Sequence, residues 1–227
     1  MNSSVITFPG SNCDRDMDVA LKKFGFKNKM VWHDDVELPK SDLVVLPGGF
    51  SYGDYLRCGS MASKSKIMKS VINFAQGGGK VMGICNGFQI LVESGLLPGV
   101  LLRNKYLEFI CKNIFVKVND KNNIYFKNIK KDILEFHIAH NEGNYFCSND
   151  QIKKINDNNQ IALLYSDEDG NIDEKNNPNG SCRNIAGIFN KEKNVLGMMP
   201  HPERMIDSAL SGEDGSLFFK NLINNLR

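Results

Sequence analysis

The chain has no apolar run of about 18 residues, the length that a membrane-spanning helix requires. Its 28 lysines and arginines nearly balance its 26 aspartates and glutamates, so no excess positive charge favours nucleic acid or an anionic membrane surface. The first residues contain no charged segment followed by a long apolar stretch, so no signal peptide is recognised. We therefore expect a cytoplasmic protein that binds neither nucleic acid nor a membrane.

Motifs for metals and nucleotides are missing as well. The six cysteines show no C-x-x-C or other zinc-ligand spacing, and the four histidines form no H-E-x-x-H motif. A triple glycine followed by lysine, at residues 77–80, continues with valine and so departs from a phosphate-binding loop. We expect free thiols in a reducing compartment, no metal site, and no use of a nucleotide by this chain alone.

The first hundred residues alternate strand and helix patterns. Short apolar runs predict buried strands at residues 5–8, 30–32, 43–46 and 80–84. Apolar residues three and four positions apart predict amphipathic helices over residues 17–24 and 68–75. This order indicates an α/β fold, with a mainly parallel open sheet flanked by helices on both faces. Such sheets carry their sites at the carboxyl ends of the strands.

The second half of the chain has a different pattern. Residues 105–118 and 134–146 are extended and partly alternating, which favours antiparallel additions to the sheet. Residues 167–184 are polar and rich in glycine, asparagine and aspartate, so we expect a surface loop there. Two strands and a closing helix are predicted at residues 185–189, 195–199 and 217–226. No linker or repeat interrupts the pattern, so residues 1–227 are interpreted as a single domain.

A candidate nucleophile lies between the strand at residues 80–84 and the helix that begins near Asn86. Gly83-Ile84-Cys85-Asn86-Gly87 has the G-x-C-x-G spacing, which is the thiol version of a nucleophile elbow. A cysteine is more often a small buried apolar side chain, and we interpret the other five in that way. Cys85 differs because the amino end of a helix favours the thiolate over the thiol.

A candidate general base follows the strand at residues 195–199. In Met199-Pro200-His201-Pro202-Glu203, each proline disfavours the helical conformation of the residue before it. In an extended segment, residues two apart point the same way, so Glu203 is predicted to hold the His201 imidazole. Alone, His201 would be interpreted as a loop residue and Glu203 as a solvated charge. Together with Cys85 they make a triad of nucleophile, base and orienting acid.

A third loop is a candidate oxyanion hole. Leu46-Pro47-Gly48-Gly49 follows a strand, and the paired glycines allow the N–H of Gly49 to face a reacting carbonyl. With the N–H of Asn86 it would supply two donors, each worth about 3 kcal/mol to a tetrahedral intermediate. Without the other two features, this segment would be interpreted as a plain turn.

Gly-Ile-Cys-Asn-Gly-Phe-Gln at residues 83–89 and His-Pro-Glu at residues 201–203 resemble the motifs of the triad-type glutamine amidotransferases. Within that family, the chain is similar essentially from end to end to the glutamine amidotransferase subunits of phosphoribosylformylglycinamidine synthases. The further segments that carry this resemblance are residues 8–14, 47–57, 178–181 and 197–204. The resemblance implies a flavodoxin-like class I glutamine amidotransferase fold.

The resemblance also implies roles for the matching residues. Cys85 would form a γ-glutamyl thioester, His201 would shuttle protons, and Glu203 would orient His201. The backbone N–H groups of Gly49 and Asn86 would bind the oxyanion.

Gln89 would contact the glutamine substrate; without the resemblance it would be interpreted as a helix residue facing solvent. The implied partners are a large synthetase subunit, which uses ATP and Mg on its own chain to activate formylglycinamide ribonucleotide, and a small third subunit. No cofactor is implied in this chain.

The sequence departs from the family pattern at three positions. Asn141 occupies a position where we expect glycine, and Cys58 and Ser60 replace residues that we expect to be small and apolar. Three other interpretations are kept open beside the leading one. They are an amidotransferase subunit for another acceptor, a stand-alone thiol hydrolase on the same fold, and a catalytically silent binding subunit.

Overall fold

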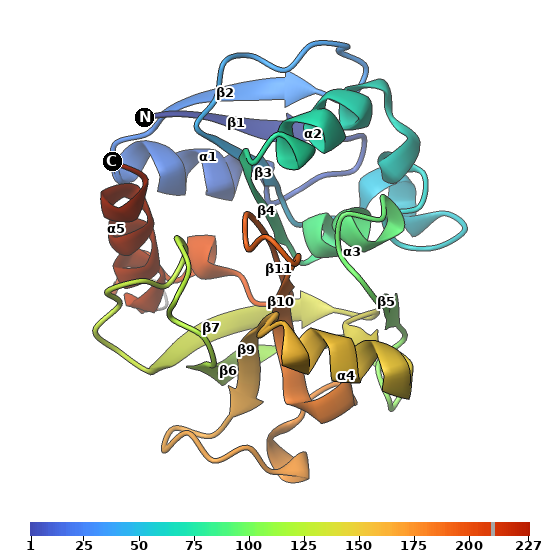
Figure 1. The fold of residues 1–227 in the computed structure, drawn as a ribbon, viewed down its shortest axis with the longest axis vertical. Coiled ribbons are helices and arrows are strands. Elements are labelled where there is room, and N and C mark those ends of the chain that lie inside the picture. Colours follow the sequence, from blue (N-terminus) through green and yellow to red (C-terminus); the bar gives the residue numbers. More distant parts are fainter. Residues whose placement is uncertain (210–211) are drawn as a thin grey trace.

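A computed structural model describes residues 1–209 and 212–227. A nine-stranded sheet crosses the molecule in the order β2-β1-β3-β4-β11-β10-β9-β6-β7 (Figure 1). Its first five strands pair in parallel. They are β2 (Lys27–Trp32), β1 (Asn2–Thr7), β3 (Leu43–Leu46), β4 (Lys80–Ile84) and β11 (Val195–Met198). The loops that follow β1, β3, β4 and β11 therefore meet at one edge of the sheet.

The remaining strands of the large sheet are antiparallel, and this orientation was predicted for the segments that contain β6 and β7. They are β10 (Ile185–Phe189), β9 (Ile161–Ser166), β6 (Ile110–Val118) and β7 (Ile133–His140). A separate two-stranded sheet pairs β5 (Val100–Leu102) with β8 (Asn144–Phe146). The sheet is thus mixed and its parallel half carries the predicted site.

Helices cover both faces of the parallel half. Figure 1 shows α1 (Asp14–Lys23) and α5 (Asp214–Leu226) along one side, and α2 (Lys66–Gln76) and α3 (Asn86–Glu93) along the other. The rings of Phe24 and Phe219 stack where α1 meets α5, with centroids 5.6 Å apart. A fifth helix, α4 (Asn149–Asp157), lies beside the antiparallel strands. The predicted α/β class, with helices on both faces of a mainly parallel sheet, is confirmed.

Several predicted boundaries were wrong. The segment 105–118 is a strand only from Ile110, and 134–146 divides into β7 and β8 at a turn. The prediction for residues 167–184 missed short 3₁₀ helices at Glu174–Asn176 and Cys182–Asn184, and Asn179 and Ser181 inside that loop are buried.

Among the described α-helices and β-strands, α4, β5 and β9 were not predicted at all. A capping box that pairs Ser148 with Gln151 begins α4, and every residue of β9 is buried.

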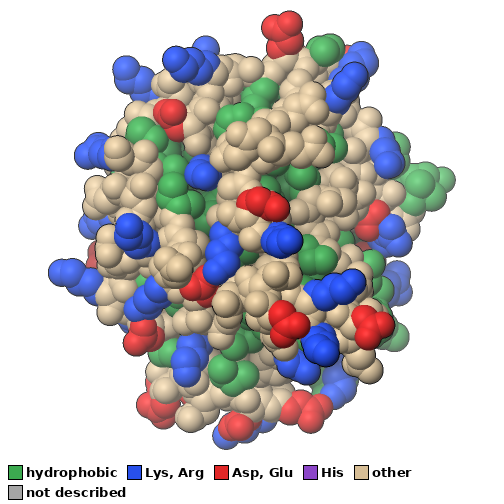
Figure 2. Space-filling view, in the orientation of Figure 1, with side chains coloured by type: hydrophobic (Ala, Val, Ile, Leu, Met, Phe, Trp, Pro, Cys, Tyr) green, Lys and Arg blue, Asp and Glu red, His purple; other side chains and the backbone are tan. Residues whose placement is uncertain are grey.

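The surface of the molecule mixes charges. Figure 2 shows acidic and basic side chains interspersed over the face seen in Figure 1. Among the described residues, no helix combines the length and the apolar character needed to cross a bilayer.

The start of α3 packs directly on β3. A side chain at Gly87 would collide with the backbone oxygen of Leu46, and one at Gly83 would collide with Gly87 and Leu91. The two glycines of the elbow are therefore required by a close approach of backbone to backbone. This contact fixes where α3 begins relative to the sheet.

Gly87→Ala is predicted to destabilise the protein by about 3 kcal/mol or more, because the added methyl group can be accommodated only if α3 moves off β3. The matched control is Gly77→Ala at the end of α2, where an added methyl group meets its neighbours at ordinary distances of 3.4 Å and 3.5 Å. That variant is expected to change the free energy of unfolding by less than about 1 kcal/mol. Urea unfolding checks both values, and equal stabilities would contradict the packing argument.

Candidate active site

The candidate nucleophile lies at the sharp turn between β4 and α3. Cys85 has φ 50° and ψ −105°, a left-handed conformation that a non-glycine residue adopts only when its surroundings impose it. Its N–H donates to the backbone oxygen of Met198 on β11 at 2.8 Å, and its Sγ lies 3.7 Å from the backbone oxygen of Ala139. The thiol thus sits at the amino end of α3 and at the carboxyl end of β4, as an elbow requires.

His201 and Glu203 form a buried pair in the loop after β11. Nδ1 of His201 lies 2.6 Å from Oε1 of Glu203, and the two side chains are 1% and 0% exposed. The backbone N–H of His201 donates to the oxygen of His137 on β7 at 2.8 Å, which anchors the loop to the antiparallel half of the sheet. The short contact holds the imidazole ring through Nδ1. The other ring nitrogen, Nε2, therefore stays free to accept a proton.

The predicted reason for this contact was wrong in part. Pro202–Arg204 forms a short 3₁₀ helix, η5, rather than an extended segment. His201 itself keeps a non-helical backbone, with φ −103° and ψ 87°. A proline at the first position of a helical turn is favourable, because it needs no N–H acceptor there. The turn still brings Glu203 back onto the imidazole.

The imidazole lies close to the nucleophile. Burial by itself lowers the pKa of His201, but the charges of Glu203 and of the Cys85 sulfur outweigh burial and hold that pKa well above its ordinary value. Within the described part of the chain, Nε2 of His201 has no hydrogen-bond partner. A nitrogen that is buried, unpartnered and near a thiol can accept that thiol's proton.

The loop after β3 closes the site. A side chain at Gly48 would lie 2.6 Å from Cε1 of His201, so the missing side chain leaves room for the ring. Gly49 has φ 142°, a conformation open to glycine, and forms an isolated bridge with Ser11. Asn86 is the first residue of α3, where backbone N–H groups have no helical acceptor. The Oδ1 atom of Asn86 accepts from the N–H of Ser51 at 3.2 Å and so ties this loop to the helix.

Gln89 is buried rather than facing solvent. Its Nε2 donates to the backbone oxygen of Glu142 at 2.7 Å, and its Oε1 accepts from Nδ2 of Asn86 at 2.9 Å. The side chain therefore joins α3 to the turn after β7, one helical turn beyond Cys85. The N–H of Gln89 also donates to the backbone oxygen of Cys85 at 3.2 Å.

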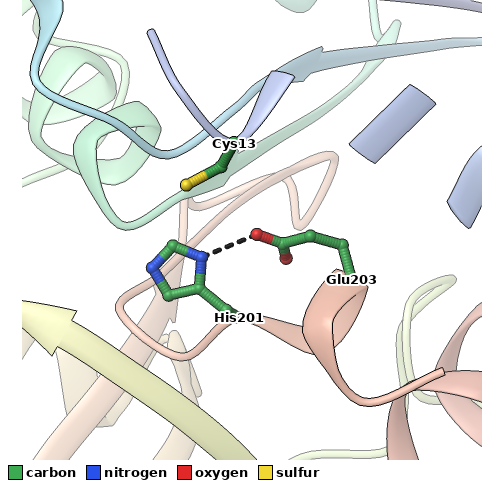
Figure 3. A group of neighbouring side chains, drawn as sticks. All are labelled: Cys13, His201 and Glu203. Atoms are coloured by element: carbon green, nitrogen blue, oxygen red, sulfur yellow. Dashed lines mark hydrogen bonds and ion pairs between the residues drawn. The ribbon is translucent and has the colours of Figure 1, made fainter. Parts of the chain in front are cut away.

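Two residues that sequence reasoning missed also contact the site. Cys13, which we had interpreted as a small apolar side chain, places its sulfur next to the His201 ring (Figure 3). The Nη2 atom of Arg204 donates to Sγ of Cys13 at 3.1 Å. The one available signal was that both residues lie in segments that carry the family resemblance, residues 8–14 and 197–204.

Cys13, His201 and Glu203 are the candidate metal ligands of the described residues, with ligand atoms within 4.8 Å of one another. Sulfur, nitrogen and oxygen are donors that zinc accepts. However, the 2.6 Å contact already engages Nδ1 of His201 and Oε1 of Glu203 with each other. The arrangement present is that of a base held by an acid.

The turn after β7 is held by a second buried histidine. The Oδ1 atom of Asn104 accepts from the N–H of Gly143 and lies 3.0 Å from Nδ1 of His140. Burial, followed by the charge of His201, lowers the pKa of His140 to about 4. The family departure at Asn141 does not distort this turn, because Asn141 is not among the residues with positive φ and a glycine is not needed there.

The other two departures lie in the connection between β3 and α2. Cys58 is buried; burial, then the charge of Asp54, raises its pKa, and Glu142 adds to this effect. Ser60 donates its N–H to the backbone oxygen of Arg57 at 3.0 Å.

A thiol on a strained strand-to-helix turn, beside a buried imidazole and carboxylate on an α/β sheet, defines a triad-type thiol enzyme that acts on acyl compounds. The chain belongs to the CobB/CobQ-like glutamine amidotransferase domain family, whose model matches residues 1–212. The predicted family resemblance is thereby confirmed.

Two relatives of this chain carry the same protein name. The chain is 88% identical over 227 residues to phosphoribosylformylglycinamidine synthase subunit PurQ of Pelagibacter ubique, covering 100% of both chains. It is 48% identical over 228 residues to the protein of the same name from Chlorobaculum parvum, covering 100% of this chain and 90% of that one.

Two solved structures share the fold of this chain. PurLQS from Thermotoga maritima matches with a TM-score of 0.87 and 39% identity, covering 100% of this chain and 99% of that one. A glutamine amidotransferase from Thermotoga maritima matches with a TM-score of 0.64 and 16% identity, covering 100% and 98%. The second likeness concerns the fold alone.

Glu203→Gln is predicted to lower kcat for glutamine hydrolysis on the order of 10²- to 10⁴-fold, because the amide keeps the shape of the side chain but removes the charge that supports a protonated His201. Glu192→Gln, at an exposed glutamate, is the matched control and is expected to keep the original kcat. Steady-state assays of the assembled complex measure both. A Glu203→Gln variant with full activity would show that the pair is only structural.

The lowered pKa of His140 predicts a pH dependence of stability. A histidine that stays neutral in the folded protein stabilises it fully above pH 6.5, and this contribution is lost as the pH falls toward about 4. The His140→Gln variant lacks this pH-dependent contribution to the free energy of unfolding. Between pH 7.5 and 4.5 its free energy of unfolding should therefore fall by about 2 to 3 kcal/mol less than that of the original protein. Urea unfolding at several pH values measures the difference, and parallel curves would contradict the assignment.

Proposed function

We propose that this chain is the glutaminase subunit of a phosphoribosylformylglycinamidine synthase. It hydrolyses L-glutamine to glutamate and ammonia, and the ammonia passes to an ATP-dependent synthetase subunit. That subunit converts formylglycinamide ribonucleotide to formylglycinamidine ribonucleotide in purine biosynthesis. The observation that carries the proposal is the buried His201–Glu203 pair beside a strained Cys85. The chain that holds this site is 88% identical to a phosphoribosylformylglycinamidine synthase subunit over its whole length.

The first chemical step is attack by sulfur. His201 takes the proton of Cys85, and the thiolate adds to the carboxamide carbon of glutamine. The resulting oxyanion lies where the N–H groups of Gly49 and Asn86 would donate to it. His201 then returns the proton to the nitrogen, ammonia leaves, and a γ-glutamyl thioester remains on Cys85.

The second step releases glutamate. A water molecule gives a proton to His201 and attacks the thioester carbon, and Cys85 leaves as the thiolate or thiol. The Glu203 carboxylate, in contact with Nδ1 of His201, stabilises the imidazolium that forms twice in the cycle. Burial of the pair makes this charge stabilisation larger than it would be in water.

Gln89 lines the substrate pocket in this proposal. Its amide bridges Asn86 and the backbone oxygen of Glu142, so it holds the two walls between which glutamine would lie. A substrate carboxamide or backbone group replacing one of these contacts would be recognised by the same side chain.

The chain itself is proposed to need no cofactor. ATP and Mg belong to the synthetase subunit, and a small third subunit completes the complex. We propose a cytoplasmic location for the assembly, which agrees with the free state of the cysteines, as expected in a reducing compartment.

Cys85→Ala in the reconstituted complex tests the proposal. Glutamine-dependent synthesis should fall by at least about 10³-fold, since the acyl-accepting atom is gone, while synthesis from added ammonium chloride continues at the original rate. Formation of formylglycinamidine ribonucleotide is measured with each nitrogen source. Loss of both activities would contradict the assigned division of labour. Turnover of peptides by the isolated chain would instead favour a stand-alone thiol hydrolase.

A further inference from the structure

A second pair of thiols lies outside the candidate active site. Cys147 directly follows β8, and Cys182 begins the 3₁₀ helix η4 (Cys182–Asn184). The N–H of Tyr145 on β8 donates to Oγ of Ser181 at 3.0 Å, and β8 and η4 are in contact. This hydrogen bond joins the residue two before Cys147 to the residue directly before Cys182, so both cysteines are brought to the same place.

Cys182 is one of the groups that act on the Cys147 thiol. Burial raises the pKa of Cys147 to about 11, and the charge of a Cys182 thiolate adds to this increase. Both thiols are free; Cys147 is 7% exposed, whereas Cys182 is partly exposed. Cys182 is therefore the thiol that a reagent from solution reaches first.

A hollow with mainly basic charged walls lies beside η4. The residues on either side of Cys182, Ser181 and Arg183, line a hollow of about 560 Å³. Its other charged walls are Lys105, Lys175 and Glu174, which leaves an excess of positive charge. A small anionic disulfide is attracted to such a surface and positioned beside Cys182.

We propose that Cys147 and Cys182 form a redox-sensitive pair, which a small anionic disulfide such as oxidised glutathione converts reversibly into an intramolecular disulfide. The Cys182 thiolate attacks one sulfur of glutathione disulfide and releases one glutathione thiolate. The Cys147 thiol, on losing its proton, then attacks the Cys182 sulfur and releases the second glutathione. Two protein thiols are oxidised, and one disulfide is reduced to two glutathione molecules.

The cross-link would affect the turn after β7, which contacts Gln89 of the candidate active site. Oγ of Ser181 and Nδ2 of Asn179 donate to the backbone oxygen of Gly143 at 3.2 Å and 2.8 Å. The next residue back, Glu142, holds the amide of Gln89. A disulfide fixes its two sulfurs about 2.05 Å apart, so its formation draws η4 and β8 together and displaces this turn.

This effect on catalysis rests on the proposed function. A displacement of about 1 Å in a positioning wall can lower turnover on the order of 100-fold. We therefore expect the oxidised complex to turn over glutamine about 10- to 100-fold more slowly and to recover fully with dithiothreitol.

Mass spectrometry tests the modification without reference to activity. The full chain is incubated with oxidised glutathione, alkylated and digested. A Cys147–Cys182 linked peptide should appear, with two alkylatable thiols lost per chain and restored by dithiothreitol. Cys182→Ser should abolish the linked peptide, and Cys111→Ser, which changes an exposed cysteine on β6, should leave it unchanged. Free Cys147 and Cys182, or a glutathione adduct that persists on Cys182, would overturn the proposal.

Activity of the complex then separates the two claims. Oxidation should slow the original protein and the Cys111→Ser variant but not Cys182→Ser, which excludes oxidation of Cys85 as the cause. A linked peptide with unchanged glutamine turnover would overturn the regulatory claim alone. A complex without glutaminase activity under reducing conditions would instead contradict the proposed function and leave the mass measurement unaffected.

Discussion

The left-handed backbone of Cys85 is the constraint on which the site depends. Such a conformation costs on the order of 1–3 kcal/mol and persists only where neighbouring structure fixes it. The hydrogen bond from Cys85 to Met198 and the close approach of Gly87 to Leu46 supply that fixation. Because β4 pairs with both β3 and β11, the same packing that strains the cysteine also brings the glycine loop and the His201 loop to it.

Burial determines the chemistry of the loop after β11. A carboxylate as buried as that of Glu203 is unfavourable without a partner, and His201 is that partner at 2.6 Å. Cys13 and Arg204 add a thiol and a cation at the edge of the same cluster. The dry surroundings strengthen each of these charge interactions, so a modest number of side chains can activate the nucleophile and support the imidazolium.

Much of the fold could be predicted, because the central parallel strands β3, β4 and β11 are almost wholly buried and appear as continuous apolar runs. The strand expected at residues 105–109 was wrong, since no neighbouring strand pairs there and Tyr106, Leu107 and Phe109 are exposed. The contact between His201 and Glu203 was predicted from spacing, although a 3₁₀ turn makes it. Cys13 was missed because its contact with Arg204 joins residues 191 positions apart, which no local pattern reveals.

Covalent trapping is the most direct measurement of the central claim, that the strained thiol beside His201 is the nucleophile. The assembled complex is treated with a glutamine analogue that carries an electrophilic carbon at the carboxamide position, and the modified residue is located by peptide mass spectrometry. One adduct per chain is expected, on Cys85, and glutamine should protect the thiol from labelling. An adduct on Cys13 or Cys58, with Cys85 left unmodified, would contradict it.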